Sequence, residues 1–462
     1  MRNFFLLLTA ILSCLRNESF GQVSFSQKSD SLTFRHIFDF ALTKSQCFET
    51  LTDLTSIGGR LTASPQAAQA VDFMKKILNQ NMFDSVWLQP CYVPHWVRGD
   101  KEVAYAESKG VKTNLSITAL GNSSGTGTGG ISAQVIEIKN FRELDSLGEK
   151  NIKGKIVFYN HPFDESFIDQ FRAYGEAVGY RWAGPSRAAK YGAIGTVVRS
   201  MTSAHDDYPH TGAMGYNDSF PKIPCCAVSI IGAEKLIEMI HHDPNTKFYY
   251  RSTCEMKKDS VLSYNVIGEL RGTEFPNQFI TVGGHLDSWE TGRGAQDDGA
   301  GVVQSVEVLR IFKGLGLRPK HTIRCVCFMN EENGGKGGAK YADEAKRKKE
   351  THLFAIETDA GGFTPKGFGF TGDTTAIRKI QSWKKLFEPY HIYELNFGGG
   401  GSDIEHLEGF CKILCGLSPD SQRYFNYHHA ASDVIENVNK RELELGAAAM
   451  SALIYLIDEY GL

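Results

Sequence analysis

The sequence has no long hydrophobic run after its first residues and no block of basic residues. A membrane-spanning helix requires roughly 18 or more consecutive apolar residues, and beyond the N-terminus no stretch approaches that length. We therefore expect no transmembrane segment. Binding to nucleic acid depends on clustered Lys and Arg that neutralise phosphates, whereas this chain carries a net charge of only −3. The sequence therefore predicts no nucleic-acid partner.

Two common signatures of hydrolases are also missing. No HExxH helix, the zinc motif of many metallopeptidases, occurs in the chain. The letters GxSxG do occur, as GNSSG at 121–125, but they continue into TGTGG instead of a helix. A serine nucleophile at this motif needs a strand before it and a helix after it. We interpret 121–125 as a loop, so a covalent serine mechanism is not favoured.

The cysteines do not form the pattern of a disulfide framework. Ten are present, and nine remain if Cys14 is removed with an N-terminal signal. An odd number leaves at least one thiol unpaired within the chain. Cys325 and Cys327 alternate with apolar residues, as on one face of a strand. We expect these cysteines to be small buried side chains and not metal ligands.

The N-terminus is typical of a secretory signal. Arg2 precedes a mostly apolar run from Phe4 to Leu12, which is too short to span a bilayer. Ser19 and Gly21 provide small residues for cleavage after position 21. Residues 1–21 are therefore predicted to be a signal peptide, with export to the periplasm or the extracellular space. Lipoprotein anchoring through Cys14 is the alternative, although the preceding ILS fits that signal poorly.

With 462 residues, the chain is expected to form more than one compact unit. Residues 22–120 read as helical to about 82 and β-like beyond it, and form the first part of the main domain. A Gly/Ser/Thr-rich segment then opens an α+β module at 121–250. From 251 to 462, strands alternate with helices, which predicts a doubly wound, mostly parallel α/β sheet with helices on both faces.

Acidic and histidine side chains follow four predicted strands of this sheet. In open α/β sheets, ligands bind beyond the carboxyl ends of the strands. These residues are His285, Asp287 and Asp297 after FITVGG, Glu331 and Glu332 after TIRCVCFMN, Asp359 after LFAIE, and His428 and His429 after CKILCGL. We expect them to gather at one edge of the sheet.

Such a gathering of carboxylates favours a metal site over a solvated acidic rim. Like charges repel one another, and burying them unpaired is costly. Imidazole nitrogens and carboxylate oxygens together suit zinc. One zinc ion takes about three protein ligands, and this set supplies more, so two ions sharing a carboxylate are expected. The HDDYPH segment at 205–210 has similar letters but lies in the other module.

The motifs in this order resemble the co-catalytic di-zinc exopeptidases related to bacterial leucyl aminopeptidases. The matching segments are GGHLDSWETGRGAQDDGAG, NEENGGKGG, IETDAGGF, GGGGSDI and YHHAASD. The resemblance covers roughly residues 45–460. It implies a metallo-exopeptidase that cleaves dipeptides or short peptides with free termini by metal-activated water. It further implies that 121–250 is an inserted protease-associated domain and that the protein is a homodimer.

The resemblance also assigns roles to individual residues. It places one Zn²⁺ on His285 and Asp359, the second on Glu332 and His429, and Asp297 between the two ions. Glu331 is implied to be the general base, and Asp287 to hold His285. His428 occupies a place where relatives often carry an oxyanion-stabilising tyrosine. Gly400 and Ser402 lie in a glycine-rich wall where a substrate backbone could approach closely.

Two other functions stay open on the sequence alone. Transferrin-receptor ectodomains resemble this architecture but have lost metal ligands and are binding modules. Glutaminyl cyclases resemble the same sheet but use one zinc ion and act on an N-terminal glutamine. The complete ligand set in this chain favours the peptidase.

Overall fold

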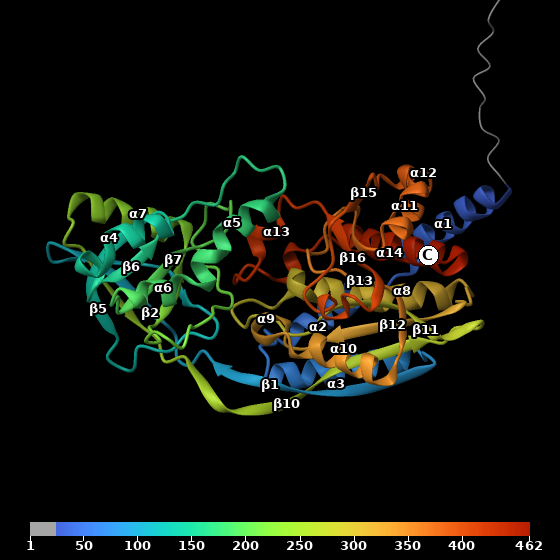
Figure 1. Cartoon of the computed structure of the whole chain (residues 1–462), viewed down its shortest axis with the longest axis horizontal. Coiled ribbons are helices and arrows are strands. Elements are labelled where there is room, and N and C mark those ends of the chain that lie inside the picture. Colours follow the sequence, from blue (N-terminus) through green and yellow to red (C-terminus); the bar gives the residue numbers. More distant parts are fainter. Residues whose placement is uncertain (1–24) are drawn as a thin grey trace, which may run out of the picture.

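The computed structural model describes residues 25–462, and the signal-peptide prediction for 1–21 lies outside them. The chain forms two units that lie side by side, each built on an eight-stranded sheet (Figure 1). None of the helices within 25–462 has the length and apolar character needed to cross a membrane.

The first sheet has a parallel centre and antiparallel flanks. Its strands lie in the order β1 (Ser85–Val97), β10 (Glu255–Leu270), β12 (His321–Phe328), β11 (Phe275–His285), β13 (Thr351–Glu357), β16 (Cys411–Pro419), β14 (Pro365–Gly372) and β15 (Glu394–Phe397). β12, β11, β13 and β16 are parallel. β10 runs antiparallel to β1 and β12, and β14 antiparallel to β16.

The prediction of a mostly parallel sheet holds for the centre and for the pair β14 and β15. It does not hold for three pairs, β1 with β10, β10 with β12 and β14 with β16, which are antiparallel. The chain leaves the first sheet along β1, builds the second unit, and returns along β10. Because it leaves and returns at the same end, β1 and β10 must run in opposite directions. The mixed α/β architecture itself is confirmed.

Helices cover both faces of the first sheet, as expected for a wound α/β fold. In β12, Ile323, Cys325 and Cys327 join one buried cluster, whereas Val326 and Phe328 join another on the opposite face. The first cluster includes residues of α1 (Phe25–Lys44), α2 (Cys47–Ser56), α3 (Pro65–Gln80), α8 (Ala300–Gly314) and α14 (Lys440–Tyr460). The second includes α10 (Lys336–Lys348).

The second unit is also an α/β layer structure. Its strands lie in the order β3 (Val111–Asn114), β2 (Val103–Ser108), β9 (Lys247–Arg251), β5 (Ile131–Ile138), β6 (Ile156–Tyr159), β7 (Gly195–Arg199), β8 (Cys225–Val228) and β4 (Ile117–Ala119). Its helices are α4 (Phe141–Ile152), α5 (Gln170–Trp182), α6 (Gly184–Lys190) and α7 (Ile230–His242).

The second sheet begins earlier in the chain than the glycine-rich segment suggests. Strands β2, β3 and β4, from residues 103 to 119, already belong to it. These strands are short and partly exposed, so their residue pattern does not reveal which sheet they join. The segment at 121–130 is a loop inside the unit and not a linker before it.

All nine cysteines of the described chain are unpaired, and all but Cys411 are buried. Cys325 and Cys327 lie in the core on the same face of β12, as predicted. Within residues 25–462, packing and not disulfide bonding holds the fold together.

Candidate metal centre

The parallel centre of the first sheet brings the predicted site residues to one edge. His285 is the last residue of β11, Asp359 follows β13, and Glu331 and Glu332 open α9 (Glu331–Gly334) directly after β12. His428 and His429 follow α13 (Tyr424–Tyr427), beyond the end of β16. Because β11, β12, β13 and β16 point the same way, these chain segments meet at their carboxyl ends.

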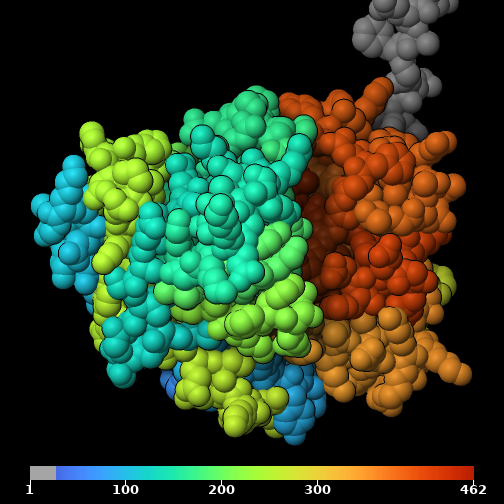
Figure 2. Space-filling model, turned by 60° about the vertical axis from the view of Figure 1, so that its left-hand side comes forward, coloured from blue at the N-terminus to red at the C-terminus, as the bar shows by residue number. Residues whose placement is uncertain are grey.

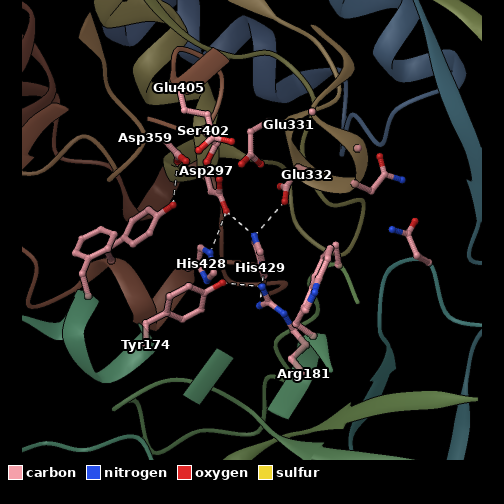
Figure 3. Close-up of a pocket in the computed structure, with 18 of the residues that line it drawn as sticks. Tyr174, Arg181, Asp297, Glu331, Glu332, Asp359, Ser402, Glu405, His428 and His429 are labelled. Atoms are coloured by element: carbon pink, nitrogen blue, oxygen red, sulfur yellow. Dashed lines mark hydrogen bonds and ion pairs between the residues drawn. The ribbon is translucent and has the colours of Figure 1, made fainter. Parts of the chain in front are cut away.

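Asp297 lies between two groups of possible metal ligands (Figure 3). Its Oδ1 is 3.2 Å from His285 Nε2, which is itself 3.7 Å from Asp359 Oδ1. Its Oδ2 is 3.1 Å from His429 Nε2, which is 3.0 Å from Glu332 Oε2. One carboxylate thus faces an imidazole and a second carboxylate on each side.

The two adjacent histidines are not equivalent. Their rings stack with centroids 3.5 Å apart, so both lie near Asp297. His428 Nε2 is 3.8 Å from Asp297 Oδ2, compared with 3.1 Å for His429 Nε2. In addition, only His429 forms an ion pair with Glu332 among residues 25–462.

The chemistry of this donor set fits a divalent cation. His285 Nε2 and Asp297 Oδ2 are buried and lack a hydrogen-bond partner in the described part of the chain. His285, Asp297 and Asp359 can each offer a ligand atom within 4.8 Å of the others, and so can Asp297, His428 and His429. Buried polar atoms are normally paired, and a metal ion would pair these.

The electrostatics of the cluster agree with that interpretation. Burial lowers the pKa of the His285 and His429 imidazoles, but attraction to the surrounding carboxylates outweighs it and holds both pKa values well above the usual value. Burial, with Asp297 nearby, raises the pKa of Glu332 to about 8. The raised pKa values of these three groups reflect a cluster of acids that is short of positive charge. A metal ion would supply that charge.

Two further acids hold the segment that carries Asp297. Asp433 accepts hydrogen bonds from the backbone N–H groups of Ala295, Gln296 and Asp297 at 3.1, 2.7 and 3.2 Å. Asp298 accepts from the N–H of His285 at 3.0 Å. The glycine-rich segment 283–301 is therefore fixed by side-chain acceptors, which explains how a segment with so little regular structure can position a ligand.

The carboxylate of Asp287 faces the Glu331 segment more closely than it faces His285. Its Oδ1 accepts from the N–H groups of Asn330 and Glu331 at 2.6 and 3.1 Å, and Oδ2 accepts from the Thr62 hydroxyl at 2.8 Å. By contrast, its Oδ1 is 3.9 Å from His285 Nδ1. His285 Nδ1 instead lies 3.0 Å from the backbone carbonyl of Asp287.

Glu331 lines a cavity of about 470 Å³ over this cluster. Burial raises the pKa of Glu331 to about 7, and the neighbouring Asp359 and Asp297 contribute in the same direction. A carboxylate with a pKa near neutrality can both accept and return a proton at working pH.

The cavity lies between the two units. The first unit contributes the acids, the two histidines, Ser402 and Tyr424, and the second contributes Tyr174 and Arg181 from α5. Figure 2 shows the hollow between the green surface of the second unit and the orange-to-red surface of the first.

Gly400 lines an adjoining cavity of about 620 Å³, and Ser402 and Asp359 border both cavities. The glycine-rich segment that contains Gly400 and Ser402 is held in place at its end. There, Glu357 Oε2 accepts from the N–H groups of Asp403 and Ile404, each at 3.0 Å. A side chain at Gly401 would collide with the Glu357 carboxylate. Glycine is required at this point because the backbone approaches a buried acid.

Sequence reasoning did not find Tyr174, Arg181 or Tyr424. Arg181 Nη2 donates to the Tyr174 hydroxyl at 2.6 Å, and the Tyr424 hydroxyl donates to Asp359 Oδ1 at 3.2 Å. Tyr174 and Arg181 are separated from the acidic motifs by more than 100 residues and lie in an otherwise ordinary helix. Only the docking of the two units brings them to the cavity.

Comparison with known proteins shows the family to which the chain is similar. The model of peptidase family M28 matches residues 265–454. Carboxypeptidase Q of Xenopus laevis is 36% identical over 404 residues, covering 87% of this chain and 84% of the relative. The human carboxypeptidase Q is 33% identical, covering 90% and 86%.

The chain belongs to peptidase family M28. It is a metallopeptidase, and the resemblance to this family and to carboxypeptidase Q is confirmed. The segments that carry the closer resemblance to carboxypeptidase Q are SPQAAQA (64–70), PHTG (209–212), FPKIP (220–224), the HLDSW…DDGAG stretch and LGLRPK (315–320).

Solved structures support the same fold. The peptidase M28 precursor of Shewanella amazonensis aligns with a TM-score of 0.88 and 29% identity, covering 93% of this chain and 97% of that one. An aminopeptidase from Aneurinibacillus sp. strain AM-1 aligns with a TM-score of 0.60 at 20% identity, covering 90% and 95%, which shows a shared fold only.

Proposed function

We propose that the protein is an exported di-zinc exopeptidase that hydrolyses dipeptides or short peptides with free termini. His285 and Asp359 would hold one Zn²⁺, Glu332 and His429 the other, and Asp297 would bridge them. The observation that carries this proposal is the position of Asp297, whose two oxygens lie 3.2 and 3.1 Å from imidazoles on opposite sides. Zinc in known relatives adds support, since one solved structure of the same fold is named a zinc aminopeptidase.

Zinc bound here would polarise the scissile carbonyl and lower the pKa of a water molecule near it. Glu331 faces the same cavity and would act as the general base, taking a proton from the attacking water and returning it to the leaving amine. Its pKa of about 7, raised chiefly by burial, suits both steps. Asp287 fixes the backbone of Glu331 and so holds the base in place.

A hydrogen-bond donor is needed where negative charge develops on the carbonyl oxygen. His428 lines the cavity and, by the resemblance, takes the place of a tyrosine in relatives. Tyr174 lies beside it, with ring centroids 5.1 Å apart. Its hydroxyl accepts a hydrogen bond from Arg181, which leaves its own proton available. We propose Tyr174 as the donor, with His428 as the alternative.

The size and position of the cavity favour short substrates. A volume of about 470 Å³ between two packed units accommodates a few residues and not a folded protein. In this proposal the second unit is the inserted protease-associated domain, the protein is a homodimer, and residues 1–21 direct it out of the cytoplasm. These three features rest on the resemblance and on the N-terminal sequence.

The test is hydrolysis of unblocked dipeptides by zinc-loaded and chelated protein, with N-acetylated and C-amidated dipeptides as controls. We expect turnover only with zinc and only with free termini. Metal analysis accompanies the assay, since a binding module of the transferrin-receptor type would purify without two equivalents of zinc. A glutaminyl cyclase would instead release a cyclised product from N-terminal glutamine. Zinc-loaded protein that cleaves no dipeptide would refute the proposal.

A further inference from the structure

A short segment of the second unit, His210–Gly212, contacts the turn that carries His428 and His429. The N–H of Thr211 donates to the carbonyl of His429 at 3.0 Å. Thr211 also places its own carbonyl oxygen 3.3 Å from His429 Nδ1. His210 Nδ1 lies 2.7 Å from the carbonyl of His428, and both side chains are buried. The two histidines are thus held from the opposite unit at three points.

The contact with Thr211 leaves Nε2 of His429 available to a metal ion. An imidazole that binds a metal through one nitrogen carries its proton on the other, and that proton is normally donated to a carboxylate or a backbone carbonyl. His429 Nε2 faces Asp297 and Glu332, so Nδ1 is the nitrogen left to donate. The carbonyl of Thr211 is the acceptor in reach. Arg181 Nη1 lies 3.4 Å from the same nitrogen, but a guanidinium can only donate. With the proton on Nδ1, Arg181 instead donates to the carbonyl of Thr211, at 3.3 Å, and fixes its position.

The backbone of His429 also needs support from outside its own turn. Its φ is 62°, in the left-handed region that residues other than glycine seldom adopt. Such conformations persist when surrounding contacts over-determine them. The hydrogen bonds from His210 and Thr211 to the carbonyls of His428 and His429 supply such contacts.

The ligands on the other side of the cluster take their hydrogen bonds from the first unit. His285 is oriented by the carbonyl of Asp287 and by the carboxylate of Asp298, both within the first unit. Asp359 accepts from Tyr424, also of the first unit. The half of the site formed by His285 and Asp359 is therefore built from one unit, whereas the half with Glu332 and His429 requires the second unit.

We infer that His210–Gly212 is a positioning segment for the metal site, so that docking of the second unit sets the affinity of one of the two zinc positions. The inference rests on the proposed function and goes beyond it. It gives the second unit a role in forming the metal centre as well as in lining the cavity. Loss of these contacts weakens the position at Glu332 and His429 and leaves the position at His285 and Asp359 intact.

Gly212→Ala tests the inference. The added methyl group would collide with the guanidinium of Arg181 and lie 2.7 Å from His429 Nδ1. Gly127→Ala is the matched control, because Gly127 lies in the same unit, also has a positive φ, and has no atom within 4 Å of the added methyl group among residues 25–462. The readout is zinc bound per chain in a competition titration with a chelator, supported by the absorption spectrum of the cobalt-substituted protein.

We expect two zinc ions with unchanged affinity in Gly127→Ala. In Gly212→Ala we expect one ion of unchanged affinity and a second whose dissociation constant rises about 10- to 100-fold, as for the loss of a partner behind a ligand. Unchanged affinity of both ions in folded Gly212→Ala would overturn the inference while leaving the proposed function standing. Equal weakening of both ions would also overturn it. Wild-type protein that binds no zinc would overturn the proposed function as well.

His210→Phe is the second variant, and it tests the positioning role of His210–Gly212 if Gly212→Ala does not fold. It keeps an aromatic ring in the buried position but removes the hydrogen bond to the carbonyl of His428. His205→Phe is its control, since His205 is exposed and pairs only with Glu234 at the surface of the described structure. Weakening of one zinc position in His210→Phe and not in His205→Phe supports the inference. Two positions of wild-type affinity in both variants contradict it.

Discussion

Replacement of Asp287 distinguishes two possible roles of its carboxylate, which are to hold the backbone of Glu331 and to orient His285. In the structure its carboxylate holds the backbone of Asn330 and Glu331 and the Thr62 hydroxyl, whereas His285 is held by the backbone carbonyl of residue 287. Asp287→Asn keeps one oxygen for the two N–H groups and lets the Thr62 hydroxyl turn to accept from the new amide. Asp287→Ala removes all three acceptor contacts.

The magnitudes follow from these contacts. In Asp287→Ala, two backbone N–H groups lose their acceptor in a buried position, at about 1–3 kcal/mol each, so we expect about 2–6 kcal/mol less stability. A shift of the base by roughly 1 Å costs about 100-fold in rate. Asp287→Asn should lose less stability and less activity than Asp287→Ala, because its contacts with the two backbone N–H groups persist.

The assay combines kcat on an unblocked dipeptide, zinc content and thermal unfolding. We expect Asp287→Asn to keep both zinc ions, because the carbonyl that orients His285 is unchanged, and Asp287→Ala to lose about 100-fold in kcat. Loss of zinc from Asp287→Asn would show that the carboxylate acts on His285 after all. An Asp287→Ala variant with near-normal kcat would refute the role of this acid in holding Glu331.

Three further predictions follow from the site. Glu331→Gln should lower kcat by about 10²- to 10⁴-fold with zinc content unchanged, and loss of zinc would make Glu331 a ligand. Tyr174→Phe should lower kcat by about 10²- to 10³-fold with little change in KM; if His428→Phe has this effect and Tyr174→Phe does not, His428 is the donor. Removing zinc should lower the melting temperature, because ions that bind only the folded state stabilise it, and equal melting with and without zinc would contradict a site within the fold.

The sequence predicted those parts of the structure that depend on local pattern. Alternating strands and helices predicted the parallel centre, and the acids after each strand predicted which residues meet at its edge. His285 at the end of β11 and Glu332 after β12 lie where that rule puts them. Both features follow from strand direction, which the alternation of elements encodes.

Other parts depend on contacts between distant segments, for which the sequence carries no local signal. The direction of β1 and β10 depends on where the chain leaves and re-enters the first sheet. The role of the Asp287 carboxylate depends on how closely it approaches Asn330, and Arg181 reaches the cavity only through docking of the second unit. Periodicity and spacing along the chain do not report such contacts.

The central claim is that His285, Asp297, Glu332, Asp359 and His429 together hold two zinc ions. Anomalous diffraction at the zinc edge from crystals of zinc-loaded protein tests it most directly. We predict two anomalous peaks on opposite sides of the Asp297 carboxylate, one beside His285 and Asp359 and the other beside Glu332 and His429. A single peak, or peaks bound to other residues, would contradict the account.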